Sequence, residues 1–308
     1  METPQERPGR VAILLSSFNG AVYLRAQLAS IVAQTYGDWQ VIWRDDGSDD
    51  ATCAIMEEWA ALHPVRRLAG TARLGASRSF LLLLAAADAD FVAFCDQDDE
   101  WLPDKLARAV ASLACIAGPA LLCGRQILID AAGQPIGLST PPSRDLGFAN
   151  AMVQNMAVGC TIVMNRPAAR AVSMARAPVV GWHDWWCCLR VSGVGGMVIY
   201  DPVPVVRYRQ HGGNLVGARG GNFARVWRAW RRGSGVFLQA LAAQTVALAA
   251  CCDLAPAARD ALREWQGLRA GCFATRLLAL RRAGVYRQAG VDNFLLYGLF
   301  LWRRLPSP

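Results

Sequence analysis

Three carboxylates crowd the end of one apolar segment of the 308-residue chain. Asp96, Asp98 and Asp99 directly follow the run Phe91–Cys95. Carboxylates this close repel one another unless a cation offsets their charge, and such hard oxygen ligands suit Mg²⁺ or Mn²⁺. The dipole of a helix beginning near Pro103 would also stabilise the cluster. The spacing therefore favours a divalent-cation site and leaves the helix dipole as the alternative.

A second acidic turn, Asp45–Asp50, follows the segment Trp39–Trp43. A carboxylate at a strand end can accept hydrogen bonds from a nucleobase or a ribose hydroxyl, as acidic residues do in dinucleotide-binding folds. Ser48 and Asp49 can instead cap the helix that follows. Capping is the better interpretation of this turn alone, but two acidic strand ends in one sheet favour a shared nucleotide pocket.

Two further side chains are suited to proton transfer or anion binding. Asp184 lies between His183 and Trp185. Partial burial among aromatic rings raises the pKa of a carboxyl and makes it a better general base, although an N-cap ahead of a core helix is the simpler alternative. His211 stands in a glycine-rich loop after an expected strand, where an imidazole can bind a metal or a phosphate.

The elements that would position these residues alternate between strand and helix. Apolar runs at 11–15, 39–43 and 91–95 are typical of strands buried on both faces. Helical spacing follows at 24–32, 52–62, 77–87 and 103–117. This alternation predicts a parallel sheet covered by helices, with ligands at the carboxyl ends of its strands. Apparent strands at 121–129, 159–164 and 196–200, with a helix near 168–175, predict an antiparallel completion of the sheet.

Charge divides the chain into two regions. Residues 1–224 hold 19 basic and 20 acidic side chains, whereas residues 225–308 hold 13 basic and 4 acidic ones. We expect an α/β domain at 1–224 and a basic, aromatic-rich helical region at 225–308. The ten cysteines form no C-x-x-C pair and the N-terminus lacks the apolar run of a secretion signal, which predicts free thiols in a cytoplasmic protein. The longest apolar stretch, 236–252, is too short and too interrupted for a transmembrane helix.

Five segments, taken in order, resemble the family 2 glycosyltransferases with the GT-A fold, and in particular their bacterial rhamnosyltransferase-like branch. The resemblance covers about residues 10–218 and rests on Ser16–Leu24, Asp45–Thr52, Asp96–Trp101, His183–Trp186 and Tyr208–Asn214. It implies a Rossmann-like, mixed but mainly parallel sheet covered by helices.

The resemblance also implies a role for individual residues. For the nucleotide sugar, the implied residues are Ser17, Phe18 and Asn19 beside the nucleoside, Asp45 on the base, Asp96 near the ribose and metal, and Arg209 at the diphosphate. Asp98 would bind the metal, and His211 would approach the metal or the diphosphate. Asp184 would be the catalytic base, and the acceptor pocket would be bordered by Asn155, Gly159, Cys160 and Thr161.

The implied reaction is inverting transfer of one sugar from a nucleotide diphosphate sugar to a glycan or lipid-linked acceptor in cell-surface polysaccharide synthesis. Mg²⁺ or Mn²⁺ would stabilise the leaving diphosphate. The resemblance favours dTDP-rhamnose as donor, with a UDP-hexose as second choice. The Q-x-x-R-W signature of processive synthases is absent, which favours single addition. Arg44 and His183 depart from the family pattern, where a small or apolar residue and a glutamate are common.

Three other functions stand as alternatives. An inactive nucleotide-sugar-binding scaffold at the membrane is disfavoured because Asp96, Asp98, Asp184 and His211 are all present. A sugar-phosphate nucleotidyltransferase is disfavoured because Ser16–Asn19 lacks a glycine-rich loop with a basic residue. A nucleic-acid-binding module is suggested by the net charge of +8, but an acidic pocket repels phosphates, so we expect no specific nucleic-acid partner.

The basic region mixes tryptophan, arginine and leucine in the segments 225–232 and 294–304. Helices of this composition suit a membrane interface, with their cations on anionic lipid. This interpretation predicts a peripheral protein on the inner face of the plasma membrane. The alternative is a helical subdomain that packs its aromatic side chains on the α/β core.

Overall fold

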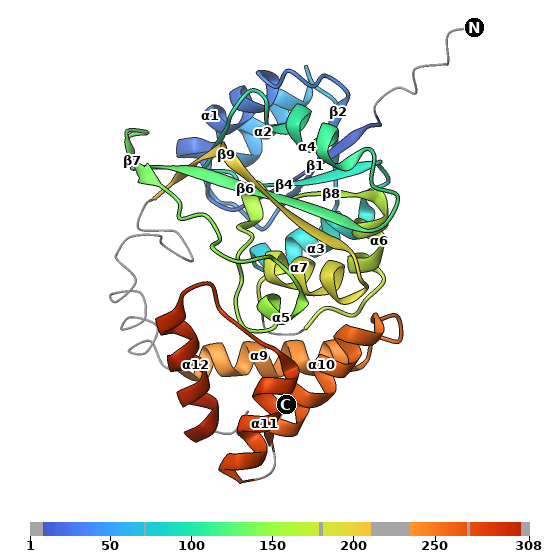
Figure 1. The fold of residues 1–308 in the computed structure, drawn as a ribbon. Coiled ribbons are helices and arrows are strands. Elements are labelled where there is room, and N and C mark those ends of the chain that lie inside the picture. Colours follow the sequence, from blue (N-terminus) through green and yellow to red (C-terminus); the bar gives the residue numbers. More distant parts are fainter. Residues whose placement is uncertain (1–8, 71, 179–180, 211–233, 270–271, 303–308) are drawn as a thin grey trace, which may run out of the picture.

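One mixed sheet crosses the molecule, with helices on both of its faces (Figure 1). The computed structural model describes residues 9–70, 72–178, 181–210, 234–269 and 272–302. Within these ranges nine strands form the sheet in the order β3-β2-β1-β4-β8-β6-β9-β5, and β7 pairs with β6 off this path. The predicted α/β architecture with C-terminal helices is confirmed.

The parallel half of the sheet comes from the apolar runs recognised in the sequence. It contains β1 (Val11–Ser17), β2 (Trp39–Asp45), β3 (Val65–Arg67) and β4 (Phe91–Cys95). Successive residues of β1 alternate between two hydrophobic cores, because side chains of a strand point to opposite faces. One core takes α1 (Ala21–Val32), α2 (Thr52–Ala60) and α4 (Lys105–Leu113), and the other takes α3 (Ala76–Ala86).

The remaining strands complete the sheet with both pairing directions. β8 (Val163–Asn165) runs antiparallel to β4 and to β6 (Ala120–Ile129), as predicted. β9 (Met197–Arg209) instead pairs parallel with β6, so a purely antiparallel completion is wrong. Two short strands also belong here, β5 (Glu100–Trp101) on β9 and β7 (Pro135–Leu138) on β6.

The strand expected at 159–164 is wrong in its first half. Residues Gly159–Thr161 form the 3₁₀ turn η1, and β8 begins only at Val163. The turn closes because both the backbone N–H and the hydroxyl of Thr161 donate to the Val158 carbonyl, at 2.9 and 2.7 Å. As a result, Cys160 is presented from a turn rather than from a strand.

The helical C-terminal region packs beneath the sheet on the side of α3 (Figure 1). Its described elements are α9 (Ser234–Ala249), α10 (Pro256–Gln266), η2 (Gly267–Arg269), α11 (Phe273–Ala283) and α12 (Gly290–Trp302). They share one hydrophobic cluster with α5 (Phe148–Ala151), α6 (Arg166–Ser173) and α7 (His183–Gly193). The expected boundary between 224 and 225 falls outside the described residues, so this division stays a prediction.

Two other expectations can be compared with the structure. All ten cysteines are free thiols, as predicted. None of the helices in the described part of the chain combines the length and the apolar character needed to cross a membrane.

Candidate active site

The carboxyl ends of three neighbouring parallel strands bring the predicted nucleotide-binding residues to one sheet edge. The register aligns Ser17 of β1 with Asp45 of β2, and Leu15 of β1 with Cys95 of β4. Asp96 follows Cys95 directly and therefore lies at the same edge. This is the position at which open α/β sheets bind ligands.

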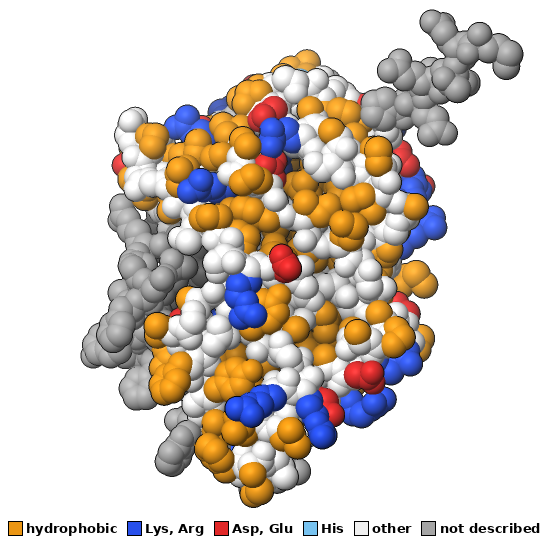
Figure 2. All heavy atoms as spheres, viewed as in Figure 1, with side chains coloured by type: hydrophobic (Ala, Val, Ile, Leu, Met, Phe, Trp, Pro, Cys, Tyr) orange, Lys and Arg blue, Asp and Glu red, His pale blue; other side chains and the backbone are white. Residues whose placement is uncertain are grey.

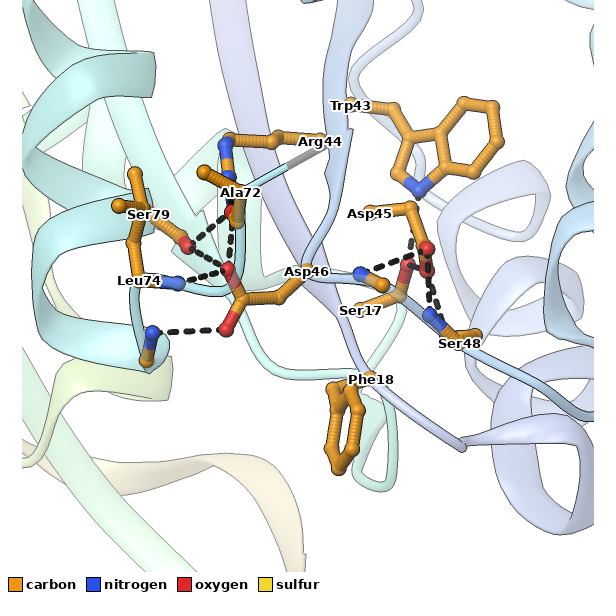
Figure 3. A network of polar contacts seen from close by, with 12 residues as sticks. Ser17, Phe18, Trp43, Arg44, Asp45, Asp46, Ser48, Ala72, Leu74 and Ser79 are labelled. Carbon is orange, nitrogen blue, oxygen red and sulfur yellow. Dashed lines mark hydrogen bonds and ion pairs between the residues drawn. The ribbon is translucent and has the colours of Figure 1, made fainter. Parts of the chain in front are cut away.

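Asp45 lies in a dense hydrogen-bond network (Figure 3). Its Oδ1 accepts from the hydroxyls of Ser17 and Ser48 at 2.9 and 2.6 Å, and its Oδ2 accepts from the backbone of Gly47 and Ser48 at 3.0 and 2.7 Å. Burial opposes ionisation of Asp45, but these donors outweigh it and lower the pKa of the carboxyl. A direct contact with a nucleobase would have to replace one of these bonds.

Phe18 and Asn19 join β1 to the two acidic turns. The backbone N–H and carbonyl of Phe18 both bond the side-chain amide of Gln97, each at 2.8 Å. Asn19 has a left-handed backbone, with φ of 47°, and bonds the second turn through Ser48 Oγ and the Asp49 N–H, each at 2.9 Å. Phe18 is therefore fixed beside the segment that carries Asp96 and Asp98.

Asp96, Asp99 and Cys160 form the one group of three potential metal ligands within the described residues, with ligand atoms all within 4.8 Å of one another. Asp96 and Asp99 lie three residues apart in a turn, and a turn brings its first and fourth residues together. Burial, followed by repulsion from Asp99 and Asp98, raises the pKa of Asp96 well above its usual value. Asp99 is buried, and in the described structure its Oδ2 has no hydrogen-bond partner.

The two carboxylates of this group fit a hard divalent cation, whereas Cys160 does not, because burial raises the pKa of its thiol well above the usual value and sulfur is a soft ligand. The repulsion among the carboxylates would be offset by the positive charge, and the Asp99 oxygen would gain a partner. Asp98 is half-exposed beside this group, and its backbone carbonyl accepts from Arg209 Nε at 2.9 Å. His211, the other predicted ligand, lies outside the described residues.

A buried lysine lies next to the group of Asp96, Asp99 and Cys160. Lys105, the single lysine of the chain, is 1% exposed and donates from Nζ to the Cys160 carbonyl at 2.6 Å. The same Nζ lies 3.4 Å from the centre of the Trp101 ring. Burial lowers the pKa of this ammonium to about 8, while the nearby carboxyls favour its charged form. Lys105 thus fixes η1 against the acidic cluster and supplies a positive charge there.

Arg209 is buried at the end of β9, with its donors directed into the protein. Its backbone N–H donates to Asp99 Oδ1 at 3.0 Å, and its guanidinium pairs with Glu100 Oε1 at 2.5 Å. These bonds hold β9 against the segment 98–100. The predicted contact between Arg209 and a diphosphate stays a prediction, while its positioning of Asp99 is visible directly.

Asp184 lies in the first turn of α7, facing the residues predicted to border the acceptor. Burial raises the pKa of its carboxyl to about 6, against smaller lowering effects from the Trp185 N–H, Asn155 and the Gly159 backbone. The charge of Asp184 also raises the pKa of Asp96, which places the two carboxyls in one electrostatic group. The expected base, acceptor-side residues and acidic cluster therefore meet in one place.

His183, next to this carboxyl, belongs to the core. Its ring stacks on Phe80 at 4.3 Å and meets Phe94 edge-on at 4.8 Å between ring centres. Burial lowers its pKa to about 3, so the imidazole is neutral. A Cβ on Gly159 would lie 2.9 Å from His183 Nε2, which explains why η1 can approach α7 only with glycine at this position.

Two supporting residues, Gln97 and Lys105, have no role in the sequence-based interpretation. Gln97 stands between two aspartates and Lys105 lies on α4, and Asp99, although part of the predicted acidic cluster, was not expected to be the partner of Asp96. Their roles depend on how the chain turns after β4. The sequence alone shows only that Lys105 is the single lysine of an arginine-rich chain.

The fold and the strand-end carboxylates together define an α/β protein with a ligand site at the carboxyl ends of its parallel strands, and comparison with known proteins assigns the family. A model described as glycosyl transferase family 2 matches residues 12–170, about half of the chain. The chain belongs to this family and is a glycosyltransferase.

Among curated relatives, the dTDP-rhamnosyl transferase RfbG of Shigella flexneri is 27% identical over 232 residues, covering 66% of this chain and 74% of its own. The UDP-Glc:alpha-D-GlcNAc-diphosphoundecaprenol beta-1,3-glucosyltransferase WfgD of Escherichia coli is 26% identical over 188 residues, covering 61% and 72%.

Solved structures support the fold. TarS 1–349 of S. aureus in complex with UDP superposes with a TM-score of 0.58 at 15% identity, covering 82% of this chain and 69% of that one. The mannosyltransferase PcManGT of Pyrobaculum calidifontis, in complex with GDP-Man and Mn²⁺, gives 0.52 at 20% identity, covering 95% and 80%. The predicted GT-A fold is confirmed.

Proposed function

We propose that this glycosyltransferase is inverting and metal-dependent, and that it adds one sugar to a hydroxyl of a glycan or lipid-linked acceptor in cell-surface polysaccharide synthesis. The observation that carries the proposal is the Asp184 carboxyl. It has a pKa of about 6, neighbours the Gly159 turn and shares an electrostatic group with Asp96. A base poised near neutral pH beside a cation site is what this reaction needs.

The proposed reaction is a single displacement. The Asp184 carboxylate takes the proton of the acceptor hydroxyl while that oxygen forms its bond to the anomeric carbon. The bond between this carbon and the diphosphate oxygen breaks on the opposite face, and the electron pair leaves with the nucleoside diphosphate. Attack on one face and departure from the other invert the configuration.

The charge that develops on the leaving diphosphate has to be stabilised. We propose that Asp96 and Asp98 hold Mg²⁺ or Mn²⁺, with Asp99 and His211 as further candidate ligands. A bound divalent cation supplies electrostatic stabilisation of the departing phosphate oxygens. Lys105 and Arg209 keep the turn and the carboxylates in place through the bonds described above.

For the donor we propose dTDP-rhamnose first and a UDP-hexose second. The similarity to RfbG, named as a dTDP-rhamnosyl transferase, supports the first choice, and the similarity to WfgD, named with UDP-Glc, supports the second. The name of WfgD also includes a diphosphoundecaprenol acceptor, which supports a lipid-linked acceptor here. A thermal-shift screen of nucleotide sugars with Mn²⁺ tests the donor, since a ligand selective for the folded state raises its stability.

We also propose that the C-terminal helices bind an anionic membrane on its cytoplasmic face. Helix α12 buries Leu296 and Phe300, but leaves Val291, Phe294 and Leu295 exposed at 66%, 79% and 44%. These positions lie on one side of the helix because Phe294 and Leu295 are three and four residues beyond Val291. Figure 2 shows hydrophobic side chains gathered over α12, with basic side chains along the neighbouring edge. The excess of 13 basic over 4 acidic residues after 224 complements anionic lipid.

Flotation with phosphatidylglycerol-containing vesicles tests this proposal. Phe294→Glu should abolish flotation, whereas Met174→Glu, at a similarly exposed position at the end of α6, should leave it unchanged. Flotation of Phe294→Glu at the wild-type level would refute the assignment. Dimers in solution that Phe294→Glu dissociates would show instead that a second copy covers the stripe.

A further inference from the structure

Two consecutive carboxylates at the end of β2 point to opposite sides (Figure 3). Asp45 faces the turn of Ser17 and Ser48. Asp46 faces the residues just before α3, where its Oδ1 accepts from the Leu74 N–H and its Oδ2 from the Gly75 N–H, each at 2.7 Å. The second carboxylate therefore anchors a different segment from the first.

Arg44 completes this anchor from within the sheet. Its side chain is 2% exposed and pairs with that of Asp46, which is 4% exposed, at 2.5 Å. The same guanidinium donates to Ser79 Oγ at 2.6 Å and to the Ala72 carbonyl. Buried ion pairs contribute little net stability, because desolvation offsets their attraction, but they can hold one specific geometry.

The segment held in this way presents Arg73. Its neighbours are tied on both sides, Ala72 through its carbonyl to Arg44 and Leu74 through its N–H to Asp46. The Arg73 guanidinium then lies over the Phe18 ring, 4.0 Å from the ring centre. Phe18 is itself held by Gln97, the residue between Asp96 and Asp98. A cation is thereby fixed at the same sheet edge as the acidic cluster.

The Arg73 guanidinium is available to bind an anion. It is exposed, and no ion pair to it is found within the described part of the chain. Stacking on Phe18 restricts the guanidinium before any ligand arrives, which reduces the entropy lost on binding. A planar guanidinium at a nucleotide edge matches the paired oxygens of a diphosphate.

We infer that Arg73 binds the diphosphate of the nucleotide donor, and that the buried Arg44–Asp46 pair is a positioning device that aims it. This inference rests on the proposed use of a nucleotide-sugar donor. Arg44, the residue that departs from the family pattern, thus gains a role at the site without touching the ligand.

The test measures binding of UDP and TDP to the full-length protein with Mn²⁺, by calorimetry. Arg73→Gln should weaken nucleotide binding by about tenfold, as expected for one lost charge-assisted contact. Arg170→Gln is the matched control, because it removes the same charge from an exposed position on α6, beside Asp88 at the amino end of β4. Because the Arg73 side chain is exposed, Arg73→Gln should keep the wild-type melting temperature.

The positioning role is tested by combining variants. Arg44→Met with Asp46→Asn removes both buried charges together, so neither is left unpaired, and should weaken nucleotide binding about as much as Arg73→Gln. Adding Arg73→Gln to these two substitutions should then weaken nucleotide binding little further, because the three residues act as one unit. Arg44→Lys keeps the charge but loses part of the fork of hydrogen bonds. Its nucleotide affinity should lie between that of the wild type and that of the double variant Arg44→Met/Asp46→Asn.

The outcomes separate the two levels of inference. If the wild type binds neither nucleotide, the proposed donor class is wrong and this inference falls with it. If the wild type binds but Arg73→Gln binds equally well, only the diphosphate contact is overturned. If Arg73→Gln weakens nucleotide binding as much in the Arg44→Met/Asp46→Asn variant as in the wild type, the buried pair does not act through Arg73.

Discussion

Replacing Asp184 by asparagine should have opposite effects on activity and on stability. The carboxyl has a pKa of about 6 in the folded protein against 3.8 for an ordinary aspartate. Because the folded state binds this proton more tightly, stability is full at low pH and declines as pH rises from about 4 to about 6. A pKa of about 6 in place of 3.8 corresponds to a loss of about 3 kcal/mol of stability at pH 8, and neutral asparagine avoids this penalty.

Activity should change in the other direction. Loss of a general base reduces kcat by about 10² to 10⁴. In the wild type, kcat/KM should fall about tenfold per pH unit below about pH 6, where the base becomes protonated. Asp184→Asn should lose this dependence, while its affinity for UDP or TDP should match the wild type.

The assays are denaturant unfolding at pH 8 and nucleoside diphosphate release with acceptor. Asp88→Asn, an exposed substitution, serves as the control for both. Near-normal turnover by a folded Asp184→Asn that binds nucleotide would refute the base assignment. A loss of several kcal/mol of stability in this variant would refute the explanation that burial raises the pKa.

Three further predictions concern the surroundings of this residue. Asp99→Asn should weaken Mn²⁺ binding at least about tenfold by electron paramagnetic resonance, and an unchanged Mn²⁺ affinity would exclude Asp99 as a further ligand. Gly159→Ala should lower kcat without changing nucleotide affinity, because its Cβ would lie 2.9 Å from His183 Nε2, whereas Gly118→Ala has open space. His183 has a pKa of about 3 when folded against 6.5 ordinarily, so wild-type stability should be lost as pH falls from about 6.5. His183→Leu should flatten this part of the stability curve, and parallel curves would contradict the reasoning.

Much of the fold follows from local pattern. Val11–Leu15 and Phe91–Cys95 are continuous apolar runs because β1 and β4 are covered on both faces, and this is legible in the sequence. The sequence indicates one strand at 196–200 and another that ends just before His211, with Pro202 and Pro204 between them, whereas β9 runs from Met197 to Arg209 as a single strand. The strand continues because these prolines lie at an irregularity, where the register against β6 shifts between Gly124 and Arg125.

The site was less predictable where contacts span distant segments. Spacing paired Asp96 with Asp98, as it would in an extended strand, but the chain turns there and brings Asp99 toward Asp96. The buried roles of Lys105 and Arg44 depend on partners 55 and 35 residues away, namely Cys160 and Ser79. No local periodicity encodes such contacts. By contrast, Asp45 is predicted by its place at a strand end and Ser17 by the family resemblance, and the parallel register of β1 and β2 puts them side by side.

Metal-assisted sugar transfer is tested most directly by the release of nucleoside diphosphate from dTDP-rhamnose and UDP-glucose by the full-length protein with Mn²⁺. We expect metal-dependent release from at least one donor, abolished by chelation and strongly reduced in Asp96→Asn. Release that persists without divalent cation, or that Asp96→Asn leaves intact, would contradict the metal-assisted mechanism. A folded wild type that releases nucleoside diphosphate from neither donor would contradict the proposed donor class.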